Sequence, residues 1–503
     1  MTENAGGRRG SRRKFLKQMA TVGAVPFAPA LIGVRPVAAQ NQVGGEAPSA
    51  HRDEETNRET ERLAAYAAAM RFEDLPSAVM QRAKDCICDT VGAIVFGGEL
   101  PWSKMIIAYA RQNGTAGRSY ILGTGSAPVH AGAAALANGA MTHAFELDNL
   151  TKPDSGSHPG ATAFSAALAV AQDRRLTGRE LITAFVAGTE SMVRIGHATK
   201  HTNEARGFHA PGTTGPFGAA VASGRLLGLD GARMANALGI AGSCAGGLLE
   251  FAHAGNGAMV KRLHMGRAAE SGVLAASLAA EGFTGPTSVL EGEYGFLRVF
   301  CNDYDLVELT RGLGETWFTL DIMMKRYACH ITAHNPVEAL LDLRREHKFG
   351  AADVEAITIA GNARMAKDNN IPAPADMMLA QYSIPFSVAL SLYRDPIDPH
   401  SFDEGVVRDR GILDLAARTK MTVVPGQDRR DLAATVTVRL KDGREVSRRV
   451  TSFMGTPERP LDRDGVREKF LLLTSRVGRD RMMPLFDRLQ NLETETSLEW
   501  LNV

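Results

Sequence analysis

The sequence predicts a mainly α-helical protein in which a large all-helical domain is followed by a smaller α+β domain. Residues 61–320 are rich in Ala, Gly and Leu, place apolar residues at helical spacing and show almost no strand-like alternation. Residues 321–455 contain segments of period-two alternation, and residues 456–503 return to a helical pattern. The chain is long enough for two or three domains with ample core.

The first 40 residues have the three parts of an export signal. SRRKFLK (Ser11–Lys17) sets two arginines before a moderately apolar stretch, Met19–Val34, and a small-residue cleavage pattern follows at Val37–Ala39. We interpret this as a twin-arginine signal peptide, which predicts a periplasmic or secreted protein exported in its folded state. The alternative is a disordered basic tail before a cytosolic enzyme. Residues 41–60 are polar and aperiodic, as expected of a linker.

The helical domain is expected to be a closely packed bundle. Several of its segments are apolar over most of the helix circumference, which is typical of helices buried on more than one side. Their many small residues allow close approach of neighbouring helices. These segments are 78–96, 131–147, 161–172 and 180–196.

The α+β domain is expected to open with a helix capped by Asn335, with Pro336 at its first position. Strands are predicted at 354–361, 419–425 and 433–452, the last folded into a hairpin by a two-residue turn at Asp442-Gly443. The helical tail after residue 456 should pack back on the first domain. Such an arrangement predicts a ligand site in the cleft between the two domains.

Composition excludes several functions. With 57 basic and 56 acidic residues, the chain is not expected to bind nucleic acid or a membrane surface as its main role. After the signal, no apolar run of about 18 residues suggests a membrane span. Five cysteines, odd in number and mostly within apolar runs, do not predict a disulfide scaffold.

The most informative stretch is NGAMTHAFELDNLTKPDSGSHPG, residues 138–160. It places His143, Asp148, Lys152 and His158 around a break between two apolar helices, where a loop can carry chemistry without disturbing the core. His158 precedes a helix whose positive end favours a neutral imidazole and attracts anions, which suits a general base. His143 lies within the preceding helix, where packing or capping competes with a catalytic role.

Three further segments carry basic residues. His209 stands before a glycine- and threonine-rich turn, which either holds a carboxylate through backbone N–H groups or is simply a tight turn. Lys261 lies in a largely apolar helix, where its ammonium group either reaches solvent or pairs with an anion. Lys325, His330 and His334 lie at the opening of the second domain.

His330 and His334 have the spacing of a helical zinc pair, but the helix is expected to start only after them and no acidic residue lies between. We therefore predict no metal site. The glycines of GTGSAPVHAG follow no strand and precede no Walker lysine, so they do not predict a phosphate site. Histidines, lysines and an aspartate in four separate segments indicate instead a cationic pocket with proton carriers.

Six ordered segments resemble the MmgE/PrpD family, which includes 2-methylcitrate dehydratase, cis-aconitate decarboxylase and iminodisuccinate epimerase. They are AKDCICDTVGAIVFG, LANGAMTHAFELDN, SHPGA, GFHAPGTTG, VKRLHMGRAAESG and KRYACHITAHNPVEAL. The resemblance covers nearly all of residues 61–475. It implies a helical domain with a lid domain, a homodimer, and a site between the domains that uses neither a metal nor an organic cofactor.

The resemblance also implies the site residues. The family's aspartate corresponds to Asp148, its histidines to His158, His209 and His330, and its two lysines to Lys261 and Lys325. An aromatic position of the lid corresponds to Phe386, where the decarboxylases are expected to have a tyrosine. The usual acidic segment DFDD is ELDN here, with Asn149 at the second acid, and Lys152 replaces a neutral or aromatic residue. These departures predict a more positive pocket.

The family's reactions need a carbanion-like centre next to a carboxylate, which suggests a role for each residue. Lys261 and Lys325 are expected to clamp the carboxylate, His158 to act as the base, and His209 or His330 to act as the acid, with Asp148 orienting a histidine. The leading hypothesis is a hydro-lyase acting on a hydroxy di- or tricarboxylate. An epimerase or a decarboxylase is the alternative within the family, and an exported carboxylate-binding protein without turnover is the alternative from another class.

Overall fold

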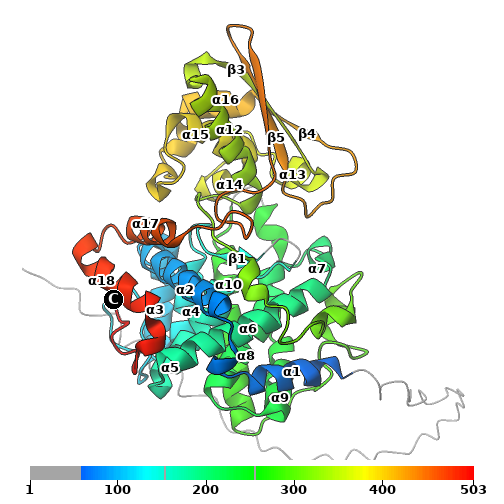
Figure 1. Cartoon of the computed structure of the whole chain (residues 1–503), viewed down its shortest axis with the longest axis vertical. Coiled ribbons are helices and arrows are strands. Elements are labelled where there is room, and N and C mark those ends of the chain that lie inside the picture. The colour runs from blue at the N-terminus through cyan, green and yellow to red at the C-terminus, as the bar shows by residue number, and fades with distance from the viewer. Residues whose placement is uncertain (1–57, 152–154, 254–256) are drawn as a thin grey trace, which may run out of the picture. The chain divides into compact units, whose positions relative to one another are not determined.

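The computed structural model describes residues 58–151, 155–253 and 257–503, and helices dominate this part of the chain (Figure 1). The fold class predicted from the sequence is therefore confirmed: mainly α, with one small sheet region. The predicted signal peptide, nearly all of the predicted linker and Lys152 lie outside the described residues. The described end of that linker is helical, because Glu59 already begins the first helix.

The helices of the first region pack closely around α10. Gly266 of α10 packs against α4, where a Cβ on Gly266 would lie 2.3 Å from the carbonyl oxygen of Leu136, so only glycine allows this approach. Gly139 of α4 faces Gly266, and a Cβ there would lie 2.7 Å from the carbonyl oxygen of Ala161. No single described helix is long and apolar enough to cross a membrane; α2 and α3, bent by 95°, meet that test only as a pair. The helices are α1 (Glu59–Ala69), α2 (Ser77–Gly97), α3 (Pro101–Asn113), α4 (Ala131–Thr142), α5 (Ser165–Arg174), α6 (Gly178–Ala198), α7 (Thr202–Ala205), α8 (Ala210–Leu226), α9 (Gly231–Gly242), α10 (Val260–Ala280) and α11 (Phe296–Phe300).

The last two helices, α17 (Arg463–Leu473) and α18 (Arg479–Gln490), pack against α2. Figure 1 shows α17 in red beside the blue α2, although the two are far apart in the sequence. Phe470 and Phe486 join the same buried apolar cluster as the core of the helical region. Burial of these rings fastens the end of the chain onto that region.

The second region contains a four-stranded sheet in the order β4-β3-β5-β6. β3 pairs in parallel with β4 and antiparallel with β5, which pairs antiparallel with β6. Helices α12, α15 and α16 pack on the sheet, and the buried residues of β3 and β5 alternate mostly with partly exposed ones. The elements are β3 (Val354–Gly361), β4 (Thr419–Val423), β5 (Ala434–Leu440), β6 (Glu445–Val450), α12 (His334–His347), α13 (Ala363–Asp368), α14 (Met377–Tyr382), α15 (Ile384–Tyr393) and α16 (Arg410–Ala417).

Two local details differ from the sequence prediction. α12 begins at His334 with Ala333 at its N-cap, because the side chain of Asn335 donates instead to the carbonyl groups of Leu432 and Thr451. The hairpin closes through Leu440 and Arg444, so its loop has three residues rather than two. Gly443 ends that loop with a φ of 89°, the left-handed conformation that a three-residue hairpin loop needs.

A short two-stranded ladder brings together segments that are far apart in the sequence. β1 (Leu150–Thr151) pairs antiparallel with β2 (Ile322–Met323). Asp148 lies two residues before β1, and Lys325 lies two residues after β2. The ladder therefore holds the ELDN segment against the segment that opens the sheet region.

Candidate active site

A cavity of about 130 Å³ lies between side chains of the helical region and of the sheet region. Its lining is rich in imidazole, ammonium and guanidinium groups and includes His143, Glu146, His158, His209, Lys261, Lys325, His330, Arg364 and Tyr382. The structure thus collects into one cavity residues from all four segments singled out in the sequence. Asp148 lies directly behind the lining and is fully buried.

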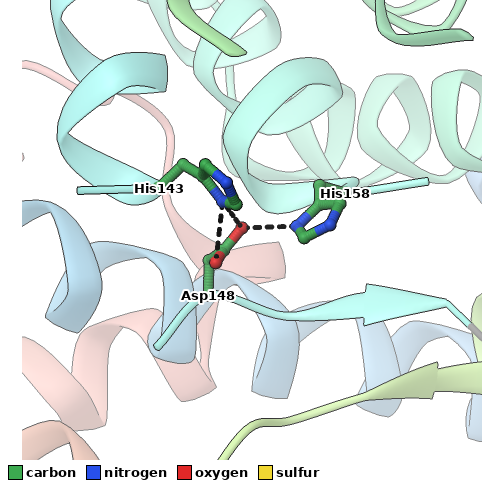
Figure 2. A group of neighbouring side chains, drawn as sticks. All are labelled: His143, Asp148 and His158. Carbon is green, nitrogen blue, oxygen red and sulfur yellow. Dashed lines mark hydrogen bonds and ion pairs between the residues drawn. The ribbon is translucent and has the colours of Figure 1, made fainter. Parts of the chain in front are cut away.

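Asp148 binds two histidines at once. Its carboxylate lies 3.0 Å from Nδ1 of His143 and 2.7 Å from Nδ1 of His158. Figure 2 shows the two rings approaching the carboxylate from different sides. His143 is the C-cap residue of α4, and His158 precedes the π-helical turn Gly160–Phe164 that leads into α5, so two helix ends deliver the imidazoles.

The surroundings lower the pKa of both Asp148 and His143, but for different reasons. Burial alone would raise the pKa of Asp148, but His143, His158 and Lys325 hold that pKa well below its usual range. Burial lowers the pKa of His143 well below the usual imidazole value, against the opposing effect of Asp148. An ionised Asp148 accepts from Nδ1–H of His158 and leaves Nε2 of that ring as its second proton site.

The two lysines bind the same carboxylate, which was not among the predicted site residues. Glu146 forms ion pairs with Lys261 through one oxygen and with Lys325 through the other, the latter at 2.8 Å. Lys325 also lies 3.8 Å from Asp148. Burial lowers the pKa of both lysines, and the charge of Lys325 lowers that of Lys261 further. The only sequence signal for Glu146 was its place as the first acid of ELDN.

His330 and Lys261 share an aromatic neighbour. The ammonium group of Lys261 lies 4.6 Å from the ring centroid of Tyr382, a cation–π distance. The imidazole of His330 packs on the same ring at 4.7 Å, and its Nδ1 lies 2.8 Å from the hydroxyl of Thr332. Burial and then Lys261 lower the pKa of His330 well below the usual imidazole value.

His209, at the N-cap of α8, pairs with a second histidine. Its Nδ1 lies 3.1 Å from Nδ1 of His264, so one ring donates and the other accepts. Burial and then His264 lower the pKa of His209 well below its usual value, and burial lowers that of His264 to about 4. Both rings are therefore neutral in the empty site at neutral pH.

Another edge of the cavity carries an ion pair between the two regions. Arg364 of α13 donates to Glu204 of α7 at 2.7 Å, and Glu204 also binds His201. Burial alone would raise the pKa of Glu204, but His201 and Arg364 hold it well below its usual range. The side chain of Arg364 is 20% exposed, so this pair reaches the cavity rather than the deep core.

One predicted site position differs from expectation. Phe386, in α15, is fully buried in the apolar core of the sheet region and is absent from the cavity lining. Tyr382, at the end of α14, supplies the aromatic ring instead. His334 also lies outside the lining, with Nε2 accepting from the backbone N–H of Tyr327 at 3.4 Å. Lys152 lies outside the described residues.

The ligand atoms of His143, Asp148 and His158 are also close enough together to bind a metal ion. Nitrogens of His143 and His158 and an oxygen of Asp148 lie within 4.8 Å of one another, and two imidazoles with one carboxylate suit a transition-metal ion. Those atoms already form imidazole–carboxylate hydrogen bonds, and the ammonium group of Lys325 adjoins the carboxylate. A second cation would be repelled there, so this arrangement suits proton transfer better than metal binding.

Comparison with known proteins agrees with this layout. The models of the MmgE/PrpD N-terminal and C-terminal domains match residues 61–308 and 327–486. The cis-aconitate decarboxylase of Aspergillus terreus (strain NIH 2624 / FGSC A1156) is 29% identical over 473 residues, which cover 87% of this chain and 94% of that protein. The cis-aconitate decarboxylase of Homo sapiens is 27% identical over 450 residues, which cover 86% and 92% respectively.

Proposed function

This chain belongs to the MmgE/PrpD family, and from that premise we propose that it is a lyase acting on a small polycarboxylate, with elimination of water as its reaction. The observation that carries the proposal is the convergence of Lys261, Lys325 and the Asp148–His158 pair on one cavity. Two ammonium groups beside a proton carrier suit removal of a proton from the carbon next to a carboxylate.

The lysines supply the charge that this step needs. Proton removal next to a carboxylate spreads negative charge onto the carboxylate oxygens, and each donor aimed at those oxygens contributes about 3 to 4 kcal/mol. Lys261 and Lys325 bind one carboxylate group of the substrate in our proposal, through the N–H groups that Glu146 leaves free. Their burial strengthens the interaction because water does not screen it.

His158 is the base in this mechanism. Asp148 holds Nδ1, so Nε2 receives the substrate proton and the negative carboxylate stabilises the imidazolium that forms. His209 or His330 donates a proton to the departing hydroxyl group. Both are neutral in the empty site, but the negative charges of a bound polycarboxylate raise an imidazole pKa and favour the acid form.

Loss of carbon dioxide is the second candidate reaction, because the relatives compared above are cis-aconitate decarboxylases. A carboxy-lyase would use the same lysine pair and would need only a proton donor for the carbon that loses its carboxylate. Elimination of water needs both a base and an acid. The presence of several imidazoles on the cavity wall supports the hydro-lyase over the simpler reaction.

Product analysis tests the proposal. Purified protein is incubated with a panel of di- and tricarboxylic acids in deuterated water, and products are identified by mass spectrometry, alkene absorbance and carbon dioxide release. An alkene without carbon dioxide supports the hydro-lyase, whereas carbon dioxide release establishes the second candidate. Exchange of the α-proton with inversion and no alkene would replace both with an epimerase. Tight binding with no chemical change would contradict enzyme function.

A further inference from the structure

Glu146 lies at the centre of the charged groups in the cavity. Each of its two oxygens faces a different lysine, and its side chain is 2% exposed. Its backbone has a φ of 58°, a left-handed conformation that is costly for a residue with a Cβ. The turn after α4 therefore holds this side chain in one place against a conformational cost.

The surroundings of the two lysines disfavour their protonated forms. Lys261 and Lys325 are both buried, and each repels the other and the nearby guanidinium group of Arg262. Among the described residues, the groups that face this cluster are Glu146, Asp148, His143, Arg262, His264, Cys329, His330, His334 and Tyr382. Of these, the two carboxylates favour the charged lysines, and Asp148 is already shared by two histidines.

We propose that Glu146 is a positioning residue that keeps Lys261 and Lys325 protonated and side by side in the empty cavity, ready for a substrate carboxylate. The inference rests on the proposed function for the identity of that ligand, but not for the state of the lysines. Glu146 bridges both ammonium groups and compensates one of their two charges. Each ammonium carries three N–H groups, so contact with Glu146 leaves donors for the substrate.

This role accounts for the presence of the Glu146 carboxylate in a cavity that is expected to bind carboxylate ligands. Without Glu146, burial and mutual repulsion would remove a proton from one lysine, and the site would offer one charged ammonium group instead of two before substrate arrived. A carboxylate fixed between two ammonium groups prevents this loss. An opposite charge at this distance commonly raises a lysine pKa by about one to three units.

Labelling of the lysines measures their protonation without requiring turnover. Trace acetic anhydride acetylates only the neutral amine, and mass spectrometry reports the rate at Lys261 and Lys325 as a function of pH. In Glu146→Gln the neutral fraction should rise, so both lysines together should react about tenfold faster or more at a given pH below the midpoint. Glu146→Asp keeps the charge and should stay near the wild-type profile.

Glu204→Gln is the matched control, because it removes from the same cavity a carboxylate side chain that is 10% exposed and contacts no lysine among the described residues. Its labelling profile should equal that of the wild type. If turnover is found, the alkaline limb of kcat/KM should also move to lower pH in Glu146→Gln but not in Glu146→Asp. A purely structural role for Glu146 would lower activity at all pH values without moving this limb.

The labelling profile decides the inference independently of the reaction. Equal profiles for wild type and Glu146→Gln would overturn it, even if the protein proves to be a lyase. The expected shift in a protein without turnover would support it while the proposed function fails. If Glu146→Gln does not fold, as judged by circular dichroism, the wild-type profile decides: midpoints of the two lysines below pH 7 would contradict the proposal, and midpoints above pH 7 would support it.

Discussion

His143 and His158 bind the same carboxylate but differ in their access to the cavity. The side chain of His143 is 1% exposed and its Nε2 lies 3.9 Å from Glu146, so that ring is enclosed by protein charges. The side chain of His158 is 11% exposed, and its Nδ1 contact with Asp148 is the shorter of the two. A base must reach its substrate, so the geometry favours His158 over His143 for the proton transfer.

Replacing His158 with Gln should therefore affect the chemical step most. The amide keeps approximate size and some hydrogen bonding but has no basicity, so kcat should fall by ~10² to 10⁴ while KM changes little. Steady-state kinetics on the substrate found by the panel measures both constants. A thermal melt identifies a mere folding defect. If the folded variant turns over at nearly the wild-type rate, the base is another group, and His209 becomes the first candidate.

Replacing Lys325 with Ala should change binding as well as catalysis. The ammonium group holds a substrate carboxylate in the ground state and in the transition state, so KM should rise and kcat should fall, each by ~10-fold or more. Lys367→Ala is a control, because this exposed lysine of α13 is not part of the cavity lining. A variant with reduced kcat but unchanged KM would show that Lys325 does not hold the substrate in the ground state.

At the scale of elements, the cavity depends on contacts that join the two regions. The β1–β2 ladder places Asp148 and Lys325 together, and the Arg364–Glu204 pair links α13 to α7. Strong periodic segments such as 78–96 and 180–196 could be predicted as helices from the sequence, and they are helical in α2 and α6. A ladder of two residues per strand has no periodicity to detect, so the contact that assembles the site was not predictable.

The Arg364–Glu204 pair should stabilise the link between α7 and α13. Arg364→Gln leaves the largely enclosed Glu204 carboxylate with His201 as its one charged partner among the described residues, which should cost about 1 to 3 kcal/mol of unfolding free energy. The cost should shrink in a Glu204→Gln background, because the partner is already absent. Urea unfolding of the wild type, the single variants and the double variant measures this coupling.

The exposed Arg439–Glu355 pair is the matched control, and Arg439→Gln should cost less than about 1 kcal/mol. Additive costs at Arg364 and Glu204 would contradict the coupling.

At the scale of the whole molecule, the sequence motifs indicated which residues lie together better than they indicated the contacts between those residues. His158, His209, Lys261, Lys325 and His330 line one cavity, as their motifs suggested. Glu146 was missed because its role follows from a left-handed backbone turn and from two lysines that are remote in sequence. Phe386 was assigned to the site from a motif alone, but its position in α15 directs the ring into the core. Side-chain direction depends on helix boundaries, and these are hard to place from sequence.

Export through the twin-arginine pathway is a prediction about residues outside the described part of the chain. Replacing Arg12 and Arg13 with lysines should retain the protein in the cytoplasm, because the paired arginines before the apolar stretch are the recognised feature. Arg8 and Arg9 form a second arginine pair farther from that stretch, so their replacement with lysines is the control and should leave export intact. Fractionation and immunoblotting measure both. Periplasmic recovery of the Arg12/Arg13 variant at the wild-type level would refute the assignment.

Buried histidines should make the folded protein sensitive to mild acid. Burial holds the pKa of His143, His209, His330 and His334 well below the usual imidazole value. Between those lowered values and about 6.5, the unfolded chain binds more protons than the folded one, so stability is full above this window and falls as the pH drops through it. Each such histidine contributes up to about 1.4 kcal/mol per pH unit.

The histidines at the two ends of α12 test whether buried imidazoles cause this loss of stability in mild acid. His334 is buried at the first residue of the helix, whereas His347 at its last residue has a side chain that is 32% exposed. Urea unfolding between pH 7.5 and pH 5 should show a decline in the free energy of unfolding for the wild type. His334→Gln should make that decline shallower, by up to the slope that one bound proton contributes. This should hold even if the variant is less stable at every pH, because the slope depends on the difference in bound protons between the unfolded and folded states and not on lost contacts. His347→Gln is the control for loss of an exposed imidazole from the other end of the same helix. A wild-type stability that stays constant down to pH 5 would mean that these imidazoles are protonated in the folded state. It would also contradict the neutral state of His209 and His330 in the ligand-free site.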